Sequence, residues 1–216
     1  MLIALFIPIL ITCSYLILVE DHVKDETNSL PPKEAYAVEP ETIGVLLKEA
    51  SHAQHDFILA LYRNSQTRKL VNDFFTKITN SAEISRVILD QADRYSVPPS
   101  LAFAVCCSES NFNHRAIGYN SSSKDLGLFQ LNSLSFPDFS DEDFFSLERN
   151  AEAGIKYLHY CLERGGNAVV ALALYNAGEG RVAFHGAPLS TLNYINSILS
   201  LRNSYEEEFR RFVFKN

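Results

Sequence analysis

The pattern of apolar and polar positions divides the chain into a leading apolar segment, a polar stretch and a long helical region. Residues 2–19 are almost all apolar, and a helix of this length, rising about 1.5 Å per residue, just spans the hydrocarbon core of a membrane. Residues 20–40 are polar, contain several prolines and show no periodicity, which is typical of a linker. We therefore interpret residues 1–19 as a membrane anchor or signal segment and residues 20–40 as a linker.

From residue 41 onward, apolar residues recur every three or four positions, which predicts a series of amphipathic helices. We expect accessory helices in residues 41–80, a helical domain in residues 81–205 and a charged tail with helical ion pairs in residues 206–216. Asn80 and Asn150 each precede an apolar periodic stretch and are expected to cap the helix that follows. The predicted helices cover residues 41–64, 66–79, 81–95, 99–110, 151–164, 169–175 and 189 onward.

Non-helical stretches interrupt this series. Residues 111–125 are rich in Asn, Ser and Gly, which predicts a loop that forms the wall of a polar ligand site. Residues 127–132 are short, apolar and led by glycine, which favours an extended segment. Its period of two would place Leu128 and Gln130 on the same side. A further glycine turn is predicted at residues 178–180, after the helix at 169–175.

Composition and charge narrow the class of protein. Almost half of the residues are apolar, including 15 Phe and 10 Tyr, which is ample for a packed core. The net charge is −7, whereas a nucleic-acid-binding protein would carry a basic stripe, so we expect no nucleic-acid partner. The helical region contains Cys106, Cys107 and Cys161. Buried free thiols are expected there, and a bridge from Cys161 to one of the other two is the alternative.

Glu109 is the first candidate for catalytic chemistry, because it falls in the last turn of the mostly apolar helix at 99–110. The negative end of the helix dipole disfavours the carboxylate by about 0.3–1 kcal/mol, which is less than one pKa unit, so burial has to supply the rest of any large upward shift. A carboxyl group that stays protonated near neutral pH can act as a general acid. The alternative is that Glu109 caps its own helix or forms a surface salt bridge.

Three motifs occur in order along the chain: Glu109-Ser110, Gly127-Leu128-Phe129-Gln130 and Ala173-Leu174-Tyr175-Asn176-Ala177-Gly178. Together they resemble the lytic transglycosylase domain of the soluble lytic murein transglycosylase family, which is related in fold to goose-type lysozyme. The resemblance extends from about Ser81 to Leu201, and residues 150–158 look like the family's helix between the second and third motifs. It implies an all-α, lysozyme-like fold with a short extended segment at the active site.

The resemblance also implies an activity and a set of site residues. The family cleaves the β-1,4 bond between MurNAc and GlcNAc in peptidoglycan, so the expected partner is a glycan strand. Glu109 would be the catalytic acid and base, Gln130 and Asn176 would bind the glycan, and Tyr175 would help to position Glu109. Ser110 belongs to the first motif and is counted with the substrate-binding residues. No metal ion or organic cofactor is implied.

This sequence departs from the family pattern around the second motif. Phe129 stands where methionine is common, Asn132-Ser133 replaces the expected proline region, and the spacing from Glu109 to Gln130 is a few residues longer than usual. For this reason the loop serine that often touches the substrate is not assigned among Ser121, Ser122 and Ser123.

Asp125 leaves other functions open, because it lies near the position where goose-type lysozymes can carry an acidic residue. As a second carboxylate that activates water, it would make the protein a hydrolytic muramidase. Its alternative role is to accept backbone hydrogen bonds within the Ser-rich loop. A function from a different class is a non-catalytic glycan-binding module of the cell envelope.

Acidic residues follow the leading apolar segment, which predicts that the rest of the chain is exported, because little positive charge holds this flank in the cytoplasm. We expect the domain on the periplasmic side of the cell envelope. It would be held there by residues 1–19 in the membrane or by a lipid on Cys13, with cleavage of the segment as the third option. The sequence identifies no partner protein within an envelope complex.

Overall fold

The structure is a computed structural model that describes residues 56–215. The predictions for residues 1–19, for the linker at 20–40, for Cys13 and for the first part of the helix at 41–64 lie outside these residues. Within residues 56–215, no helix combines the length and the apolar character needed to cross a membrane.

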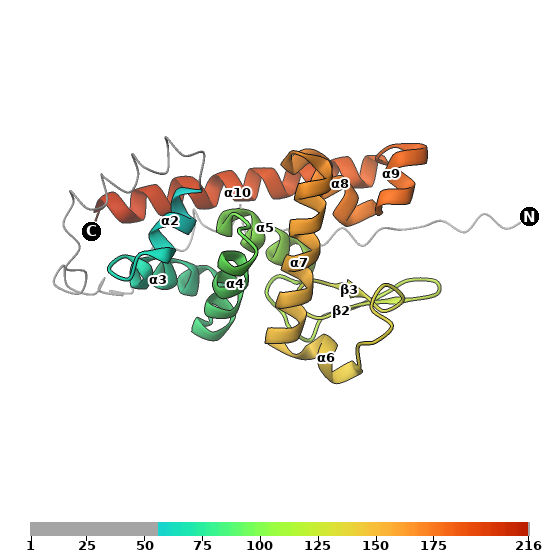
Figure 1. Cartoon of the computed structure of the whole chain (residues 1–216), viewed down its shortest axis with the longest axis horizontal. Helices are drawn as coiled ribbons and strands as arrows, with labels where there is room; N and C mark the ends of the chain where they lie inside the picture. Colours follow the sequence, from blue (N-terminus) through green and yellow to red (C-terminus); the bar gives the residue numbers. More distant parts are fainter. Residues whose placement is uncertain (1–55, 216) are drawn as a thin grey trace, which may run out of the picture. The chain divides into compact units, whose positions relative to one another are not determined.

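The described chain folds into helices and one small sheet (Figure 1). Helix α10 runs along one side of the fold and packs on α5 and α8, while α4 packs between α3 and α7. The elements are, in order, α2 (Phe57–Arg63), α3 (Arg68–Thr79), α4 (Ala82–Arg94), α5 (Pro99–Ser110), β1 (Ile117–Tyr119), β2 (Lys124–Leu126), β3 (Leu131–Asn132), α6 (Asp141–Phe145), α7 (Leu147–Gly165), α8 (Ala168–Ala177), α9 (Glu179–His185) and α10 (Leu189–Lys215).

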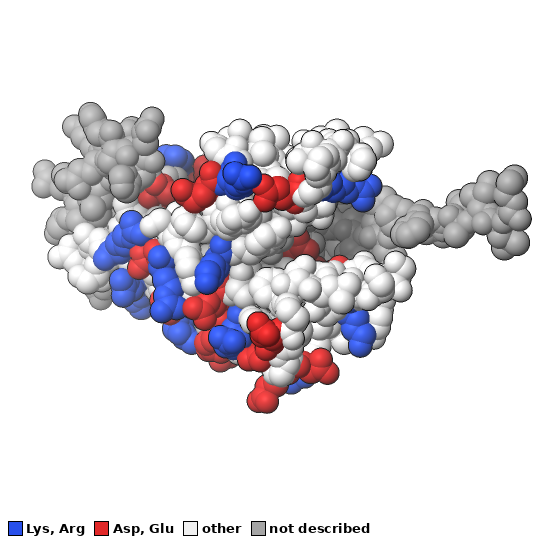
Figure 2. Space-filling view, turned by 45° about the vertical axis from the view of Figure 1, so that its right-hand side comes forward, with Lys and Arg blue, Asp and Glu red and all other residues white. Residues whose placement is uncertain are grey.

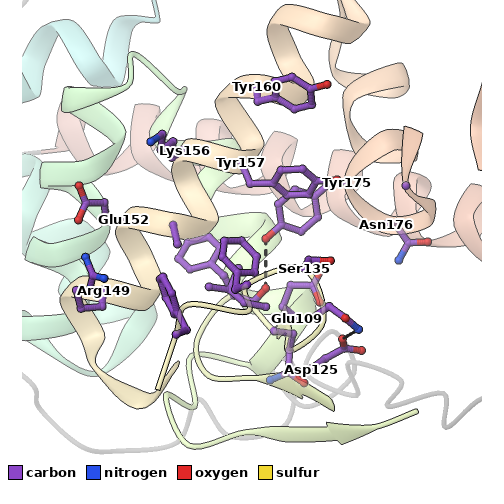
Figure 3. A pocket seen from close by; sticks show the side chains of 18 of the residues that line it. Glu109, Asp125, Ser135, Arg149, Glu152, Lys156, Tyr157, Tyr160, Tyr175 and Asn176 are labelled. Carbon is purple, nitrogen blue, oxygen red and sulfur yellow. Dashed lines mark hydrogen bonds between the residues drawn. The ribbon is translucent and has the colours of Figure 1, made fainter. Parts of the chain in front are cut away.

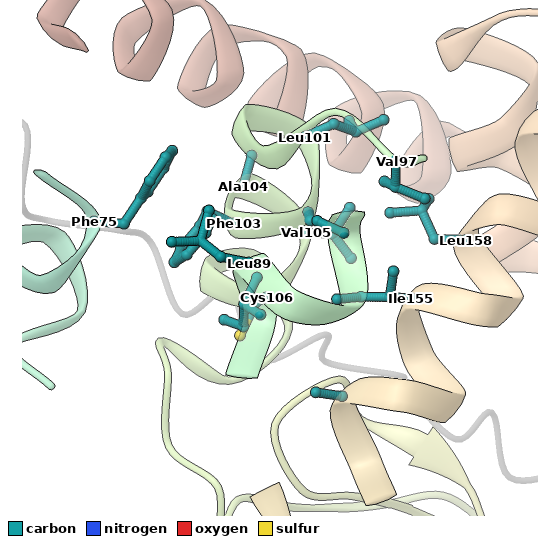
Figure 4. Close-up of a cluster of buried hydrophobic side chains, with 14 of the residues drawn as sticks. Phe75, Leu89, Val97, Leu101, Phe103, Ala104, Val105, Cys106, Ile155 and Leu158 are labelled. Carbon is teal, nitrogen blue, oxygen red and sulfur yellow. The ribbon is translucent and has the colours of Figure 1, made fainter. Parts of the chain in front are cut away.

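Helix α5 lies inside the hydrophobic core, as its sequence predicts. Every side chain from Leu101 to Cys106 is at most 1% exposed. A helix that is apolar on all sides has to be enclosed by other elements. Figure 4 shows its side chains between Phe75 of α3 and the α7 residues Ile155 and Leu158. The ring of Phe103 stacks on that of Phe75 with centroids 3.9 Å apart, so α5 is fixed from both sides.

The two predicted asparagine caps are wrong, and serines cap these helices instead. The hydroxyl of Ser81 accepts a hydrogen bond from the backbone N–H of Ile84 at the start of α4, whereas Asn80 ends α3 in the left-handed region with φ 53°. The hydroxyl of Ser146 caps α7, so that Asn150 lies inside this helix and is buried. Asparagine suits caps and left-handed positions alike, so its sequence position alone does not distinguish the two.

The all-α prediction is correct for most of residues 56–215, but residues 117–132 include a three-stranded antiparallel sheet in the order β1-β2-β3. Asp125 of β2 pairs with Gly118 on one side and with Asn132 on the other. Most of this sheet lies in the stretch predicted as a loop. Its strands are two or three residues long, which is too short for an alternating pattern to be recognised.

The segment at residues 127–132 is a tight turn at 127–130 followed by β3, so the prediction of an extended segment is correct only for its last two residues. Gly127 and Gln130 both have positive φ angles, 78° and 46°. Leu128 and Phe129 are both fully buried, while Gln130 is partly exposed. A period of two therefore does not describe these side chains, and Leu128 and Gln130 do not share a face.

Gly178, with a φ angle of 80°, ends α8 as predicted, but the glycine turn does not extend to residue 180, because residues 179–185 form helix α9. None of its residues is buried. An amphipathic stripe arises only where one face of a helix is covered, so this helix leaves no apolar periodicity in the sequence.

Within residues 56–215, the hydrophobic core continues across residues 80 and 205, where the sequence analysis divides the chain into regions. Helices α2 and α3 share one hydrophobic core with the later helices, and α10 continues without interruption to Lys215. Phe209 of α10 is fully buried, with its ring centroid 5.0 Å from that of Phe74 in α3. Residues 206–213 therefore have a buried side as well as the predicted charged one, on which Glu207 and Arg211 pair at 3.8 Å.

The close approach of Gly154 in α7 to Phe129 gives a test of this packing. A Cβ atom on Gly154 would lie 2.4 Å from Phe129 Cβ, whereas one on Gly180 in α9 would meet nothing within 4 Å. Gly154→Ala should lower the free energy of unfolding by about 1–3 kcal/mol, because it overpacks the core. Gly180→Ala should be neutral or slightly stabilising. Urea denaturation followed by circular dichroism measures both, and equal stabilities would contradict the close contact between Gly154 and Phe129.

Candidate active site

A groove of about 1000 Å³ lies between the sheet, the loop that follows it and helices α7 and α8. Five of the six residues selected from the sequence line it: Glu109, Asp125, Gln130, Tyr175 and Asn176 (Figure 3). They come from α5, β2, the turn before β3 and α8, so the fold joins motifs that are far apart in the chain. Aromatic side chains form much of the remaining wall, namely Phe136, Phe139, Tyr157 and Tyr160.

Glu109 lies at the end of α5, where the buried helix meets the groove. Burial raises the pKa of its carboxyl group from the ordinary value of 4.5 to about 7, the nearby charge of Asp125 contributes to this rise, and a hydrogen bond from Tyr194 opposes both. Asn111 ends α5 in the left-handed conformation, so Glu109 does not cap its own helix. Among the described residues no ion pair involves Glu109. The surroundings of Glu109 therefore match neither a helix cap nor a surface salt bridge, the two alternatives to a catalytic role.

Tyr194 is the residue that holds Glu109, and sequence reasoning missed it. Its hydroxyl donates a hydrogen bond to Glu109 Oε1 at 2.5 Å from the second turn of α10. The signal available in the sequence was a tyrosine on the otherwise aliphatic, core-facing side of the last helix. A buried tyrosine hydroxyl needs a partner, but the sequence does not say which one.

Asn176 is held by a second residue of α10. The hydroxyl of Thr191, which is 1% exposed, donates to Asn176 Oδ1 at 2.7 Å. The amide oxygen of Asn176 is thereby occupied, and its NH₂ group remains to donate to a ligand in the groove. Thr191 and Tyr194 are three residues apart and so face the same way on α10. The first turns of this helix thus orient groove residues from both α5 and α8.

Ser110 and Tyr175 support the turn before β3. The hydroxyl of Ser110 donates to the carbonyl of Leu128 at 2.7 Å, and that of Tyr175 donates to the carbonyl of Phe129 at 3.2 Å. Ser110 is not among the residues that line the groove. Ser110 therefore connects α5 to the turn through a hydrogen bond and does not line the groove. Tyr175 bonds to the same turn and also lines the groove.

Asn150 fixes the same turn from α7. Its side-chain oxygen accepts from the backbone N–H of Phe129 at 2.8 Å, and its NH₂ group donates to the carbonyls of Leu126 and Phe144. The side-chain NH₂ group of Gln130 donates to the carbonyls of Gly127 at 2.8 Å and Ala116 at 3.1 Å. These contacts orient Gln130 so that its amide oxygen is the atom left to accept a hydrogen bond from a ligand.

Asp125 is held by amide side chains on both sides. Its two oxygens accept from Asn120 Nδ2 and Asn132 Nδ2, each at 2.8 Å. The expected backbone donors are thus replaced by side-chain donors. Ser123 accepts from the same Asn132 at 2.8 Å, but the serine that lines the groove is Ser135, which sequence reasoning did not select.

One face of the molecule carries charges of both signs. Figure 2 shows Lys and Arg interspersed with Asp and Glu on one face of the molecule. Arg86 pairs with Asp90 at 3.2 Å, and Arg94 pairs with Glu152 at 3.0 Å. This mixed pattern differs from the continuous basic stripe that nucleic-acid-binding proteins present.

Comparison with known families identifies the domain. The family model for the transglycosylase SLT domain matches residues 86–196. The chain belongs to this family. The match confirms the resemblance found in the sequence, and it includes every groove residue discussed above together with Thr191 and Tyr194. No solved structure matches the chain significantly. Membership of the SLT domain family indicates lytic transglycosylase activity on peptidoglycan.

The SLT domain groove contains a small set of chemically active groups. Glu109 can exchange a proton near neutral pH, and Gln130 and Asn176 offer an acceptor and a donor for hydroxyl or amide groups of a sugar. Within residues 56–215, no cluster of three or more His, Cys, Asp or Glu side chains is arranged to hold a metal ion.

Two substitutions in the SLT domain should move the pKa of Glu109 in opposite directions. Tyr194→Phe removes the donor that stabilises the carboxylate, so the pKa should rise above about 7. Asp125→Asn removes a nearby negative charge, so the pKa should fall below that value. NMR titration of ¹³C-labelled glutamate measures both shifts. The control is Tyr160→Phe, whose hydroxyl bonds to Glu179 instead, and the same pKa in all four proteins would contradict the assigned causes.

Proposed function

We propose that the chain is a peptidoglycan lytic transglycosylase that cleaves the β-1,4 bond from MurNAc to GlcNAc and leaves a 1,6-anhydroMurNAc end. The observation that carries this proposal is a single glutamate at the boundary of core and groove, Glu109, whose pKa is raised to about 7. Such a group is protonated in a large fraction of molecules at neutral pH, and it is also a competent base once it has given up the proton.

In the first step Glu109 acts as the acid. Its carboxyl proton passes to the glycosidic oxygen as the bond from C1 of MurNAc breaks, and the GlcNAc side leaves as an alcohol. Tyr194 donates to Oε1, which holds the carboxyl group in one orientation and stabilises the carboxylate that forms. Gln130 and Asn176 are placed to hold the strand during this step.

In the second step the Glu109 carboxylate acts as the base. It takes the proton of the C6 hydroxyl of the same MurNAc residue while that oxygen bonds to C1, so the glutamate returns to its starting state. An internal nucleophile competes well with water, since oriented intramolecular groups reach effective molarities of about 10⁵–10⁸ M. One carboxyl group therefore suffices for both proton transfers, and no second base is required.

Asp125 favours the hydrolytic alternative only if it is available to activate water. Hydrolysis with inversion requires a second carboxylate that serves as the base for a water molecule. Both oxygens of Asp125 already accept hydrogen bonds from Asn120 and Asn132, and Asp125 pairs with Asn132 across the sheet. These contacts support a role for Asp125 in fixing the sheet beside Glu109.

We place this activity on the periplasmic side of the cell envelope, where peptidoglycan lies, with residues 1–19 or a lipid on Cys13 as the proposed anchor. The charge pattern at the start of the chain supports this placement. A reporter enzyme that works only in the cytoplasm, joined after residue 40, distinguishes export from retention.

The activity is tested on purified sacculi with two groove variants. Glu109→Gln keeps the shape of the side chain but removes the transferable proton, so turnover should fall by about 10²–10⁴-fold, with an unchanged circular dichroism spectrum. Asp125→Asn should retain most of the activity. Glu163→Gln is the matched control, because Glu163 is an exposed residue of α7 that does not line the groove.

The alternatives give different results in the same assay. Collapse of turnover in Asp125→Asn to the level of Glu109→Gln would favour the muramidase. Binding of sacculi by the unaltered protein without release of soluble fragments would identify a non-catalytic module.

A further inference from the structure

Helix α7 forms one wall of the groove with a single face. Its lining residues are Arg149, Glu152, Ala153, Lys156, Tyr157 and Tyr160, which recur at the three- and four-residue spacing of one helical face. Figure 3 shows Arg149, Glu152 and Lys156 along this helix, on a different part of the groove wall from Glu109 and Asp125.

Most charged groups on this wall have partners. Arg149 donates from Nε to Asp143 at 3.2 Å, and its guanidinium group lies 5.1 Å from the ring centroid of Phe139. Glu152 accepts from Arg94 at 3.0 Å and from the hydroxyl of Tyr95 at 3.4 Å. These contacts neutralise both side chains locally.

Lys156 is the exception on this wall. Its side chain is exposed, and within residues 56–215 it forms no ion pair, hydrogen bond or cation–π contact. Tyr157 follows it directly in the sequence, and Tyr160 lies one turn further along the helix. Lys156 therefore adds an ammonium group without a partner among the described residues to the lining of a groove that Glu109 and Asp125 also line, on another part of its wall (Figure 3).

The electrostatic potential therefore differs between the part of the groove near Asp125 and the part near Lys156. An anionic group on a ligand is repelled by Asp125 and attracted by Lys156, whereas an uncharged sugar responds weakly to either. In peptidoglycan the lactyl carboxyl of MurNAc is consumed in an amide bond, so the free carboxylates of a strand lie on its peptide stems. The only part of the substrate that a lysine would select by charge is therefore the stem peptide.

We propose that Lys156 is part of a binding site for a carboxylate of the stem peptide, so that this SLT domain prefers strands with peptide stems to strands whose lactyl groups end in an uncharged amide. The proposal rests on peptidoglycan being the substrate. The contact supplies a charge-assisted hydrogen bond from the ammonium group to the carboxylate at the rim of the groove, and it fixes which way along the groove the substituted sugar lies.

A binding experiment tests this without depending on turnover. The Glu109→Gln protein is titrated with two soluble probes, a GlcNAc–MurNAc disaccharide with its stem peptide and the same disaccharide with its lactyl carboxyl group capped as a methylamide, which carries no free carboxylate. The protein should bind the peptide-bearing probe more tightly, and adding Lys156→Met should weaken that binding by about three- to tenfold. The affinity for the capped disaccharide should not change, and high salt should reduce the difference between the probes.

Two further variants distinguish an effect of the charge at Lys156 from an effect of removing any positive charge from the protein. Lys156→Arg should preserve the preference, because it keeps the charge. Lys69→Met removes an exposed charge on α3, outside the groove, where Lys69 pairs with Asp73, and it should bind both probes as before. Equal weakening of both probes by Lys156→Met, or no weakening of either, would overturn the proposal.

Turnover of whole sacculi by the unaltered protein is measured separately. A protein that binds the probes but releases no fragments would refute the proposed activity while the assignment of Lys156 is decided by the affinities alone.

Discussion

The burial of α5 from Pro99 to Cys106 is the constraint on which the rest of the structure depends. A helical stretch that is apolar on all sides has to be surrounded, and α3, α4, α7 and α10 supply apolar surfaces that enclose it. The same enclosure places Glu109, at the last turn of α5, where the core ends and the groove begins. Burial then raises the pKa of its carboxyl group to about 7, so one packing arrangement stabilises the fold and prepares the acid. The fold and the chemistry of this SLT domain are in that sense inseparable.

Helix α10 provides the second link between packing and chemistry. Its later turns bury Phe209 against α3, and its first turns present Thr191 to Asn176 and Tyr194 to Glu109. The hydrogen bond from Tyr194 lowers the pKa of Glu109 while burial raises it. These opposing effects keep the pKa of Glu109 near neutral, which suits a residue that donates a proton in one step and accepts one in the next. A carboxyl group shifted further in either direction would perform one of the two steps poorly.

The parts of this picture that could be predicted are those that short stretches of sequence determine. The continuous apolar run before Glu109 predicts a buried helix with a perturbed acid at its end, and the order of three motifs predicts the family. Tyr194 and Thr191 were missed because their roles depend on contacts that cross 85 and 15 residues of sequence. The sequence predicts a cap at Asn150, which instead fixes the turn before β3. The strands around Asp125 are too short to leave a pattern, and α9 has no covered face to create one.

The claim that one glutamate performs both proton transfers is tested most directly by the chemical nature of the new chain end. Purified sacculi are digested with the protein in ¹⁸O-labelled water, and the released fragments are analysed by mass spectrometry. We expect fragments that end in 1,6-anhydroMurNAc, which are one water lighter than reducing-end products and contain no ¹⁸O at the new end. Fragments with a reducing-end MurNAc that carries ¹⁸O would contradict this claim and establish a hydrolase.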